Sequence, residues 1–168
     1  WVITGRERHV ARAREGLLPY PQRALRTGDY LYIINFAPDR WPMGNPYNIT
    51  ADSAPNFKTL ENNTFVTYGD LDASPTKAWL IERRNDEKWK WHYDYAFAKR
   101  PREELYVLAD DPDQVNNVAG DENFTIIKAK LNSQLIGRLK KARDPRVLGD
   151  GSTFDKPPYI NTQAKRRK

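Results

Sequence analysis

The sequence predicts an α+β fold, in which a small antiparallel β-sheet of about four strands packs against a long C-terminal helix and additional helices. Two observations carry this prediction. Short runs rich in β-branched and aromatic residues occur near the N-terminus and again at residues 103–108. One late segment repeats apolar residues at helical spacing. The order of strands, long loop, helices, strand and closing helix is typical of an α+β layout.

The first three strands are predicted near the N-terminus. Residues 1–4, "WVIT", read as a strand already under way, so we expect the chain to begin in mid-architecture. A second strand is predicted to begin at Arg23, in "RALRT", and Gly28-Asp29 then makes a turn into a third strand over residues 30–36. The second and third strands are expected to pair as a hairpin.

The middle of the chain is predicted to hold loops and two helices. Three prolines and a glycine make residues 37–48 a loop, and residues 49–74 are expected to form an irregular surface excursion. Ser74 as N-cap and Pro75 at the first helical position predict a helix. A second helix is favoured over about 88–98, although its alternating aromatic residues leave a strand as the alternative.

The last two elements are a strand over 103–108 and the longest helix, from about Glu122 to Ala142, which Asp144-Pro145 ends. An apolar stripe along this helix is suited to lie on a sheet; it consists of Phe124, Ile127, Leu131, Leu135 and Leu139. We expect one domain over 1–160 and a basic, disordered tail over 161–168.

Composition narrows the classes of function. The 168 residues include no cysteine, which excludes a disulfide frame, a thiol nucleophile and a thiolate zinc site. No apolar run approaches the roughly 18 residues of a membrane span, so no membrane partner is expected. The net charge of +6 favours an anionic partner.

The most basic segment lies between Thr4 and Arg26 and contains His9, one of two histidines. A guanidinium donates paired hydrogen bonds to oxyanions and stays charged at any working pH. Alternatives remain open for individual residues. For Arg12 and Arg14 a solvated surface is the favoured alternative, and for Arg23 or Arg26 an internal salt bridge is equally expected. The segment's arginines are Arg6, Arg8, Arg12, Arg14, Arg23 and Arg26.

Three groups of motifs resemble the C-terminal part of sulfatases of the heparan N-sulfatase (N-sulfoglucosamine sulfohydrolase)-like group. The first is "GRERH" followed by "YPQRALRTGDYLYIINFAPDRWP", and the second is "PTKAWL" with "FAKRPREELYVLADDPDQVNNVA" downstream. The third is "LNSQLIGRLKKARDPRVLGDGSTFDKPPY". The resemblance covers about residues 4–159 and is weakest over 49–74.

The resemblance implies a hydrolase of sulfuric esters, within the alkaline-phosphatase-like superfamily, that acts in glycosaminoglycan degradation. Its formylglycine nucleophile and calcium ion would lie in an N-terminal domain that this sequence does not contain. This chain would have no catalytic or metal-binding residue, and taken alone it is expected to be inactive. An extracytoplasmic setting is implied for the parent protein.

The resemblance also implies a role for this chain at the substrate. It would bind a sulfated glycan and dock on the parent protein's own N-terminal domain. The isolated fragment is expected to expose an apolar patch, which a homodimer would cover. The substrate-binding candidates are His9 and Arg23, followed by Arg6, Arg8 and Tyr20.

Three alternatives stay open beside this hypothesis. A non-catalytic module that binds polyanions or nucleic acid fits the charge and the aromatic residues, but no nucleic-acid-binding signature occurs. The aromatic residues of 89–97 are expected to pack in a core or an interface, with sugar stacking as the minor alternative. The "DDPD" run, which begins at Asp110, is expected to bond local backbone amides rather than a cation.

Overall fold

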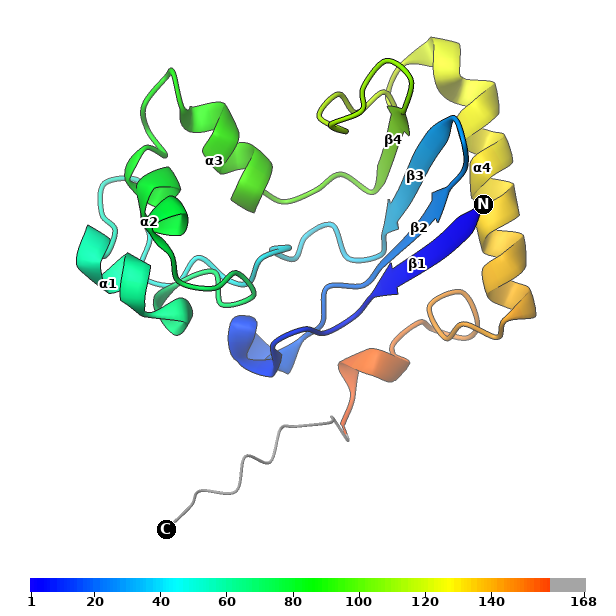
Figure 1. Cartoon of the computed structure of the whole chain (residues 1–168). Helices are drawn as coiled ribbons and strands as arrows, with labels where there is room; N and C mark the ends of the chain where they lie inside the picture. Colours follow the sequence, from blue (N-terminus) through cyan, green and yellow to red (C-terminus); the bar gives the residue numbers. More distant parts are fainter. Residues whose placement is uncertain (158–168) are drawn as a thin grey trace. The chain divides into compact units, whose positions relative to one another are not determined.

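The computed structural model describes residues 1–157 (Figure 1). Internal contacts divide these residues into two compact units, each of which is described by itself. The sheet unit comprises residues 1–7, 20–37 and 101–157, and the helical unit comprises residues 8–19 and 38–100. The prediction of one domain over 1–160 stays a prediction, and the predicted tail over 161–168 lies outside the described residues.

The sheet unit contains a four-stranded antiparallel sheet in the order β1-β2-β3-β4. Its strands are β1 (Val2–Arg6), β2 (Gln22–Arg26), β3 (Tyr30–Asn35) and β4 (Glu103–Val107). The predicted hairpin is confirmed, because β2 pairs with β3 and the Thr27 amide donates to the Tyr30 carbonyl at 2.8 Å. β1 therefore forms one edge of the sheet and β4 the other.

The long helix α4 (Thr125–Lys141) lies along one face of this sheet (Figure 1). The predicted apolar stripe is confirmed, since Leu131, Leu135 and Leu139 are buried in one cluster with sheet residues. The helix follows a 3-10 turn, η4 (Glu122–Phe124), in which the Asp121 carboxylate accepts from the Asn123 amide. The α+β prediction is therefore confirmed for this unit. The sheet residues of the cluster are Leu25, Tyr32, Ile34 and Leu105.

The helical unit contains α1 (Phe57–Asn62), α2 (Pro75–Glu82) and α3 (Lys90–Phe97). The predicted start of α2 is confirmed, because the Ser74 hydroxyl accepts from the Lys77 amide at 3.1 Å. The helical prediction for 88–98 is also confirmed. Tyr93 and Phe97, one turn apart, both pack in the core of this unit, as helical spacing allows.

The expectation of a surface excursion over 49–74 is wrong. This segment contains α1 and the turn η3 (Thr64–Val66), and it buries Leu60 and Tyr68 in the core of the helical unit. Its apolar residues are spread among polar ones, and Leu60 and Tyr68 point inward whereas Phe65 stays exposed. The side chain of Asn56 caps α1 by accepting from the Thr59 amide at 2.9 Å.

A buried lysine holds the end of this segment. The ammonium of Lys77 donates to the carbonyls of Thr64, Tyr68 and Leu71 at 3.1, 3.2 and 2.7 Å. Burial lowers the pKa of Lys77 to about 8, with the charge of Asp72 acting in the opposite direction. Three carbonyl acceptors match the three donors of an ammonium group, which explains how a lysine is accommodated without a carboxylate partner.

No helix in the described part of the chain is long and apolar enough to cross a membrane.

Candidate functional site

The five predicted substrate-binding residues fall in both units. Arg6, Tyr20 and Arg23 belong to the sheet unit, whereas Arg8 and His9 belong to the helical unit.

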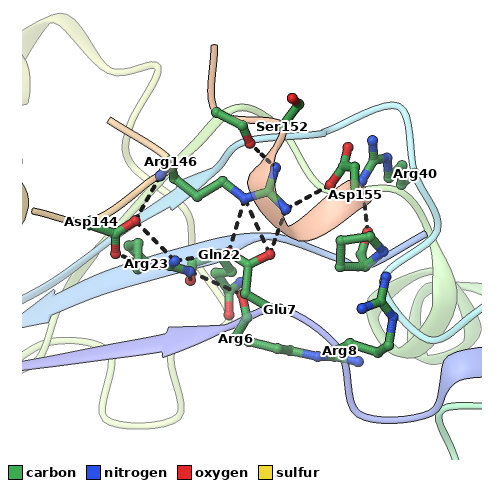
Figure 2. Close-up of polar contacts among 12 residues, drawn as sticks. Arg6, Glu7, Arg8, Gln22, Arg23, Arg40, Asp144, Arg146, Ser152 and Asp155 are labelled. Atoms are coloured by element: carbon green, nitrogen blue, oxygen red, sulfur yellow. Dashed lines mark hydrogen bonds and ion pairs between the residues drawn. The ribbon is translucent and has the colours of Figure 1, made fainter. Parts of the chain in front are cut away.

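Arg23, on β2, is held by two carboxylates within the sheet unit (Figure 2). Its Nε donates to Asp144 Oδ2 at 2.7 Å, and its Nη2 lies 2.8 Å from Glu7 Oε1. Gly5 stands opposite Arg23 in the β1–β2 register, and a Cβ there would lie 2.9 Å from the Cδ of Arg23. The glycine of "GRERH" thus makes room for the guanidinium to reach its partners.

Arg146 extends the same network. Its Nη2 lies 2.6 Å from Glu7 Oε2 and 2.8 Å from Asp155 Oδ1, and its Nη1 donates to the Gly151 carbonyl at 2.5 Å. Arg146 therefore ties the segment that follows α4 to the end of β1, where Glu7 lies (Figure 2).

The charges in this network nearly cancel, because two guanidinium groups face three carboxylates. The guanidinium groups are those of Arg23 and Arg146, and the carboxylates are those of Glu7, Asp144 and Asp155. Burial alone would lower the pKa of Arg23, but its hydrogen bonds to Asp144 and Glu7 and their charges outweigh burial and raise it. Burial alone would raise the pKa of Asp144, yet the bond and charge of Arg23 hold it below its ordinary value. The internal salt bridge expected for Arg23 or Arg26 is therefore made by Arg23, whereas Arg26 is exposed. A role of Arg23 in substrate binding stays a prediction.

Tyr20 and Arg6 contact each other in the sheet unit. The Arg6 guanidinium lies 5.8 Å from the centroid of the Tyr20 ring. The Tyr20 ring is buried, and its amide donates to the Glu7 carbonyl at 2.7 Å. Tyr20 is therefore packed beside the ion-pair network, and its role in substrate binding stays a prediction.

Arg14 lies at the centre of the arginine loop, which we define as residues 8–19 in the helical unit. The favoured expectation of a solvated side chain is wrong for Arg14, because its guanidinium is buried and pairs with Asp70 at 2.5 Å. Its Nε donates to the Trp41 carbonyl at 2.7 Å. Arg12 is exposed as expected, and its guanidinium lies 4.8 Å from the centroid of the Phe65 ring.

Asp70 joins the loop to the rest of the helical unit. Its buried carboxylate accepts from the Val10 amide at 2.9 Å and lies 3.7 Å from Nδ1 of His9. The His9 side chain is 67% exposed. Because Nδ1 is the ring nitrogen near Asp70, Nε2 is the nitrogen that a ligand would meet.

Two glycines allow the loop backbone to pack closely against its neighbours. A Cβ on Gly44, whose φ is +94°, would lie 2.7 Å from the Ala13 carbonyl oxygen. A Cβ on Gly69 would lie 3.4 Å from the Ala13 Cα. The Asn45 amide donates to the same Ala13 carbonyl at 2.7 Å. The loop is therefore fixed by backbone contacts as well as by Asp70.

Arg8 ties the two ends of the arginine loop together. Its Nε and Nη2 donate to the Leu17 carbonyl at 3.0 and 2.6 Å. Gly16 and Leu17 both adopt left-handed backbone conformations, with φ values of +67° and +57°, which turn this carbonyl back toward Arg8.

The described residues do not fit the family's nucleophile or metal. Residues 1–157 contain no group of three or more His, Asp or Glu side chains placed to hold a metal ion. Ser53 is followed by Ala54 and Pro55, but Phe57 stands where a formylglycine motif has arginine. In the "DDPD" run, the Asp111 carboxylate accepts from the amides of Val115 and Asn116 at 3.0 and 2.9 Å, which confirms the expected local bonding.

In comparisons with known proteins, no family model and no curated protein matches this chain. The resemblance to sulfatases therefore rests on the quoted motifs alone.

Proposed function

We propose that this chain forms the C-terminal, substrate-side domain of a sulfatase of the heparan N-sulfatase-like group and helps to bind a sulfated glycan. The quoted motifs support this proposal, and the four-stranded antiparallel sheet with its long helix is compatible with it.

The observation that carries the proposal is the fixed arginine loop. Asp70 and the close packing around Ala13 anchor the loop backbone at Val10 and Ala13, and the loop exposes His9. An exposed imidazole on a packed backbone can donate a hydrogen bond to a sulfate oxygen or a sugar hydroxyl, and the backbone that carries it needs little ordering on binding. Arg8 and exposed Arg12 add positive charge to the same loop.

The role of this chain is to bind and orient substrate rather than to break bonds. In the parent enzyme, formylglycine would supply the nucleophile and calcium would polarise the sulfate oxygens, both from the N-terminal domain. Arg6 and Arg23 are kept in the proposal as residues of the sheet unit that support or contact substrate. An extracytoplasmic location and a homodimer of the isolated fragment belong to the same proposal.

The test is sulfate release by the complete gene product. We expect the full reading frame that encodes this chain to contain a Cys/Ser-x-Pro-x-Arg motif upstream, and its product to release sulfate from N- or O-sulfated heparan oligosaccharides. The 168-residue chain alone should release none. A reading frame without that motif, and without a companion subunit that carries it, contradicts the proposal.

A non-catalytic polyanion-binding module is the second candidate, favoured by the net charge of +6. Binding that is tighter for single-stranded oligonucleotides than for heparan oligosaccharides, and steeply weakened by salt, would support this module instead.

A further inference from the structure

The outer face of α3 presents two aromatic rings. Trp91 and Tyr95 lie one helical turn apart, and they are 54% and 37% exposed. Tyr93 and Phe97 pack instead in the core of the helical unit. The centroids of the two exposed rings are 6.3 Å apart, and their planes meet at 63°. α3 therefore packs one aromatic pair in the core of the helical unit and exposes the other pair to solvent.

The exposed indole rests on other rings of the same unit. The His92 ring lies 3.8 Å from the Trp91 ring, centroid to centroid, at 35°. His92 in turn lies 5.3 Å from Trp89, and Trp89 lies 5.1 Å from Trp79. This row of rings supports one side of the indole, so little conformational freedom remains to be lost when a ligand stacks on it.

A fixed positive charge lies at the Tyr95 end. The Arg100 guanidinium is 5.0 Å from the centroid of the Tyr95 ring, and its Nη2 donates to the Tyr95 carbonyl. Within residues 1–157 no carboxylate forms an ion pair with Arg100. The neighbouring Lys90 and Asp94 pair with each other and so cancel in charge.

We propose that Trp91, Tyr95 and Arg100 form a carbohydrate-binding surface for an acidic sugar, which we call the α3 platform. The apolar C–H face of a pyranose would stack on Trp91 or Tyr95. A sulfate or carboxylate on the sugar would accept hydrogen bonds from the fork of Arg100. This inference goes beyond the proposed function, because none of these residues belongs to the arginine loop.

The composition of the platform favours a sugar over a nucleic acid or a protein. A nucleic-acid strand is bound through several cations along its phosphates, whereas here the charge of Lys90 is cancelled by Asp94 and the platform relies on the guanidinium of Arg100 over the Tyr95 ring. A protein interface requires a larger continuous surface than two rings supply.

The test is a calorimetric and NMR titration of the full chain with a heparin-derived hexasaccharide. We expect the indole N–H signal of Trp91 to shift on binding. The double substitution Trp91→Ala and Tyr95→Ala should raise the Kd for the hexasaccharide about tenfold. This corresponds to a loss of about 1.4 kcal/mol in binding free energy. Trp1→Ala is the matched control, because Trp1 is also an exposed indole under a guanidinium, that of Arg138 at 3.5 Å. Both exchanges lie on exposed side chains, and circular dichroism would verify the fold.

Three outcomes would overturn the α3 platform: an unchanged Kd in the double variant, an equal loss in the Trp1 control, or tighter binding of an oligonucleotide that depends on Trp91. The variant His9→Ala tests the arginine loop in the same titration, independently of the α3 platform. If His9→Ala weakens binding while the Trp91 signal stays unmoved, the proposed function stands and the platform fails. The reverse pattern rejects His9 and keeps the platform.

Discussion

The exchange Asp70→Asn tests whether one buried carboxylate holds the arginine loop. Asparagine keeps the shape of the side chain and one carbonyl oxygen, so the bond from the Val10 amide can persist. The negative charge is lost, however, so the buried guanidinium of Arg14 loses the carboxylate that lies 2.5 Å away. The variant therefore isolates the ion pair from the size of the side chain.

The expected loss is large because both partners are buried. The side chain of Arg14 is 2% exposed and that of Asp70 is 0% exposed, so solvent does not screen the pair. Removing one partner of a buried pair costs about 3–5 kcal/mol, since an uncompensated charge remains inside. This is a large share of the roughly 5–15 kcal/mol by which domains are stable. The matched control, Asp94→Asn, breaks an exposed helical pair with Lys90 and should cost about 0.5 kcal/mol or less.

Urea unfolding followed by tryptophan fluorescence measures this difference in the correct part of the chain. The chain has five tryptophans, and all except Trp1 lie in the helical unit, so the signal reports chiefly on that unit even if the two units unfold separately. A loss below about 1 kcal/mol for Asp70→Asn, indistinguishable from the control, would refute the argument that the pair holds the loop. The helical-unit tryptophans are Trp41, Trp79, Trp89 and Trp91.

Three further substitutions test the charge of Asp144 and the backbone geometry at Gly44 and Gly137. Because Arg23 outweighs burial and lowers the pKa of Asp144, the stabilisation by Asp144 is present above its ordinary pKa of 3.8 and is lost as pH falls through the lowered value. The difference in unfolding free energy between the wild type and Asp144→Asn should thus vanish in strong acid; a difference that persists there would contradict this. Gly44→Ala should destabilise by more than about 1 kcal/mol, because its φ is +94° and its Cβ would meet the Ala13 carbonyl. Gly137→Ala lies inside α4, where an added Cβ would meet open space, so it should raise the free energy of unfolding by about 0.5–1 kcal/mol. Thermal unfolding measures both glycine variants, and a stabilised Gly44→Ala or a destabilised Gly137→Ala would contradict these predictions.

Much of the secondary structure could be predicted because its signals are local. The cap at Ser74 and the stripe from Leu131 to Leu139 lie within a few turns of the helices that they specify. The β2–β3 hairpin is likewise set by residues that are close in sequence. Segment 49–74 was mispredicted because its core residues, Leu60 and Tyr68, find their partners only when α1, α2 and α3 assemble.

The candidate site was predictable in part. His9 and Arg8 were singled out by the resemblance and by the basic residues around them, and their roles in substrate binding stay predictions; the structure places both on the arginine loop, where Arg8 bonds the Leu17 carbonyl and His9 lies near Asp70. The solvated expectation for Arg14 failed because its partner, Asp70, is 56 residues away. The burial of Lys77 was missed for a similar reason. Its three partners are backbone carbonyls, which every residue type has, so the sequence does not indicate them.

The central claim is that the arginine loop recognises the sulfate groups of a glycan, and one calorimetric comparison tests it most directly. The full chain would be titrated with an N-sulfated heparan hexasaccharide and with the matching N-acetylated hexasaccharide, for the wild type and for His9→Ala. The account predicts that the wild type binds the sulfated sugar at least about tenfold more tightly, and that His9→Ala reduces this preference by about 1.4 kcal/mol. Equal affinity of the wild type for the two sugars, or a preference that His9→Ala leaves intact, would contradict it.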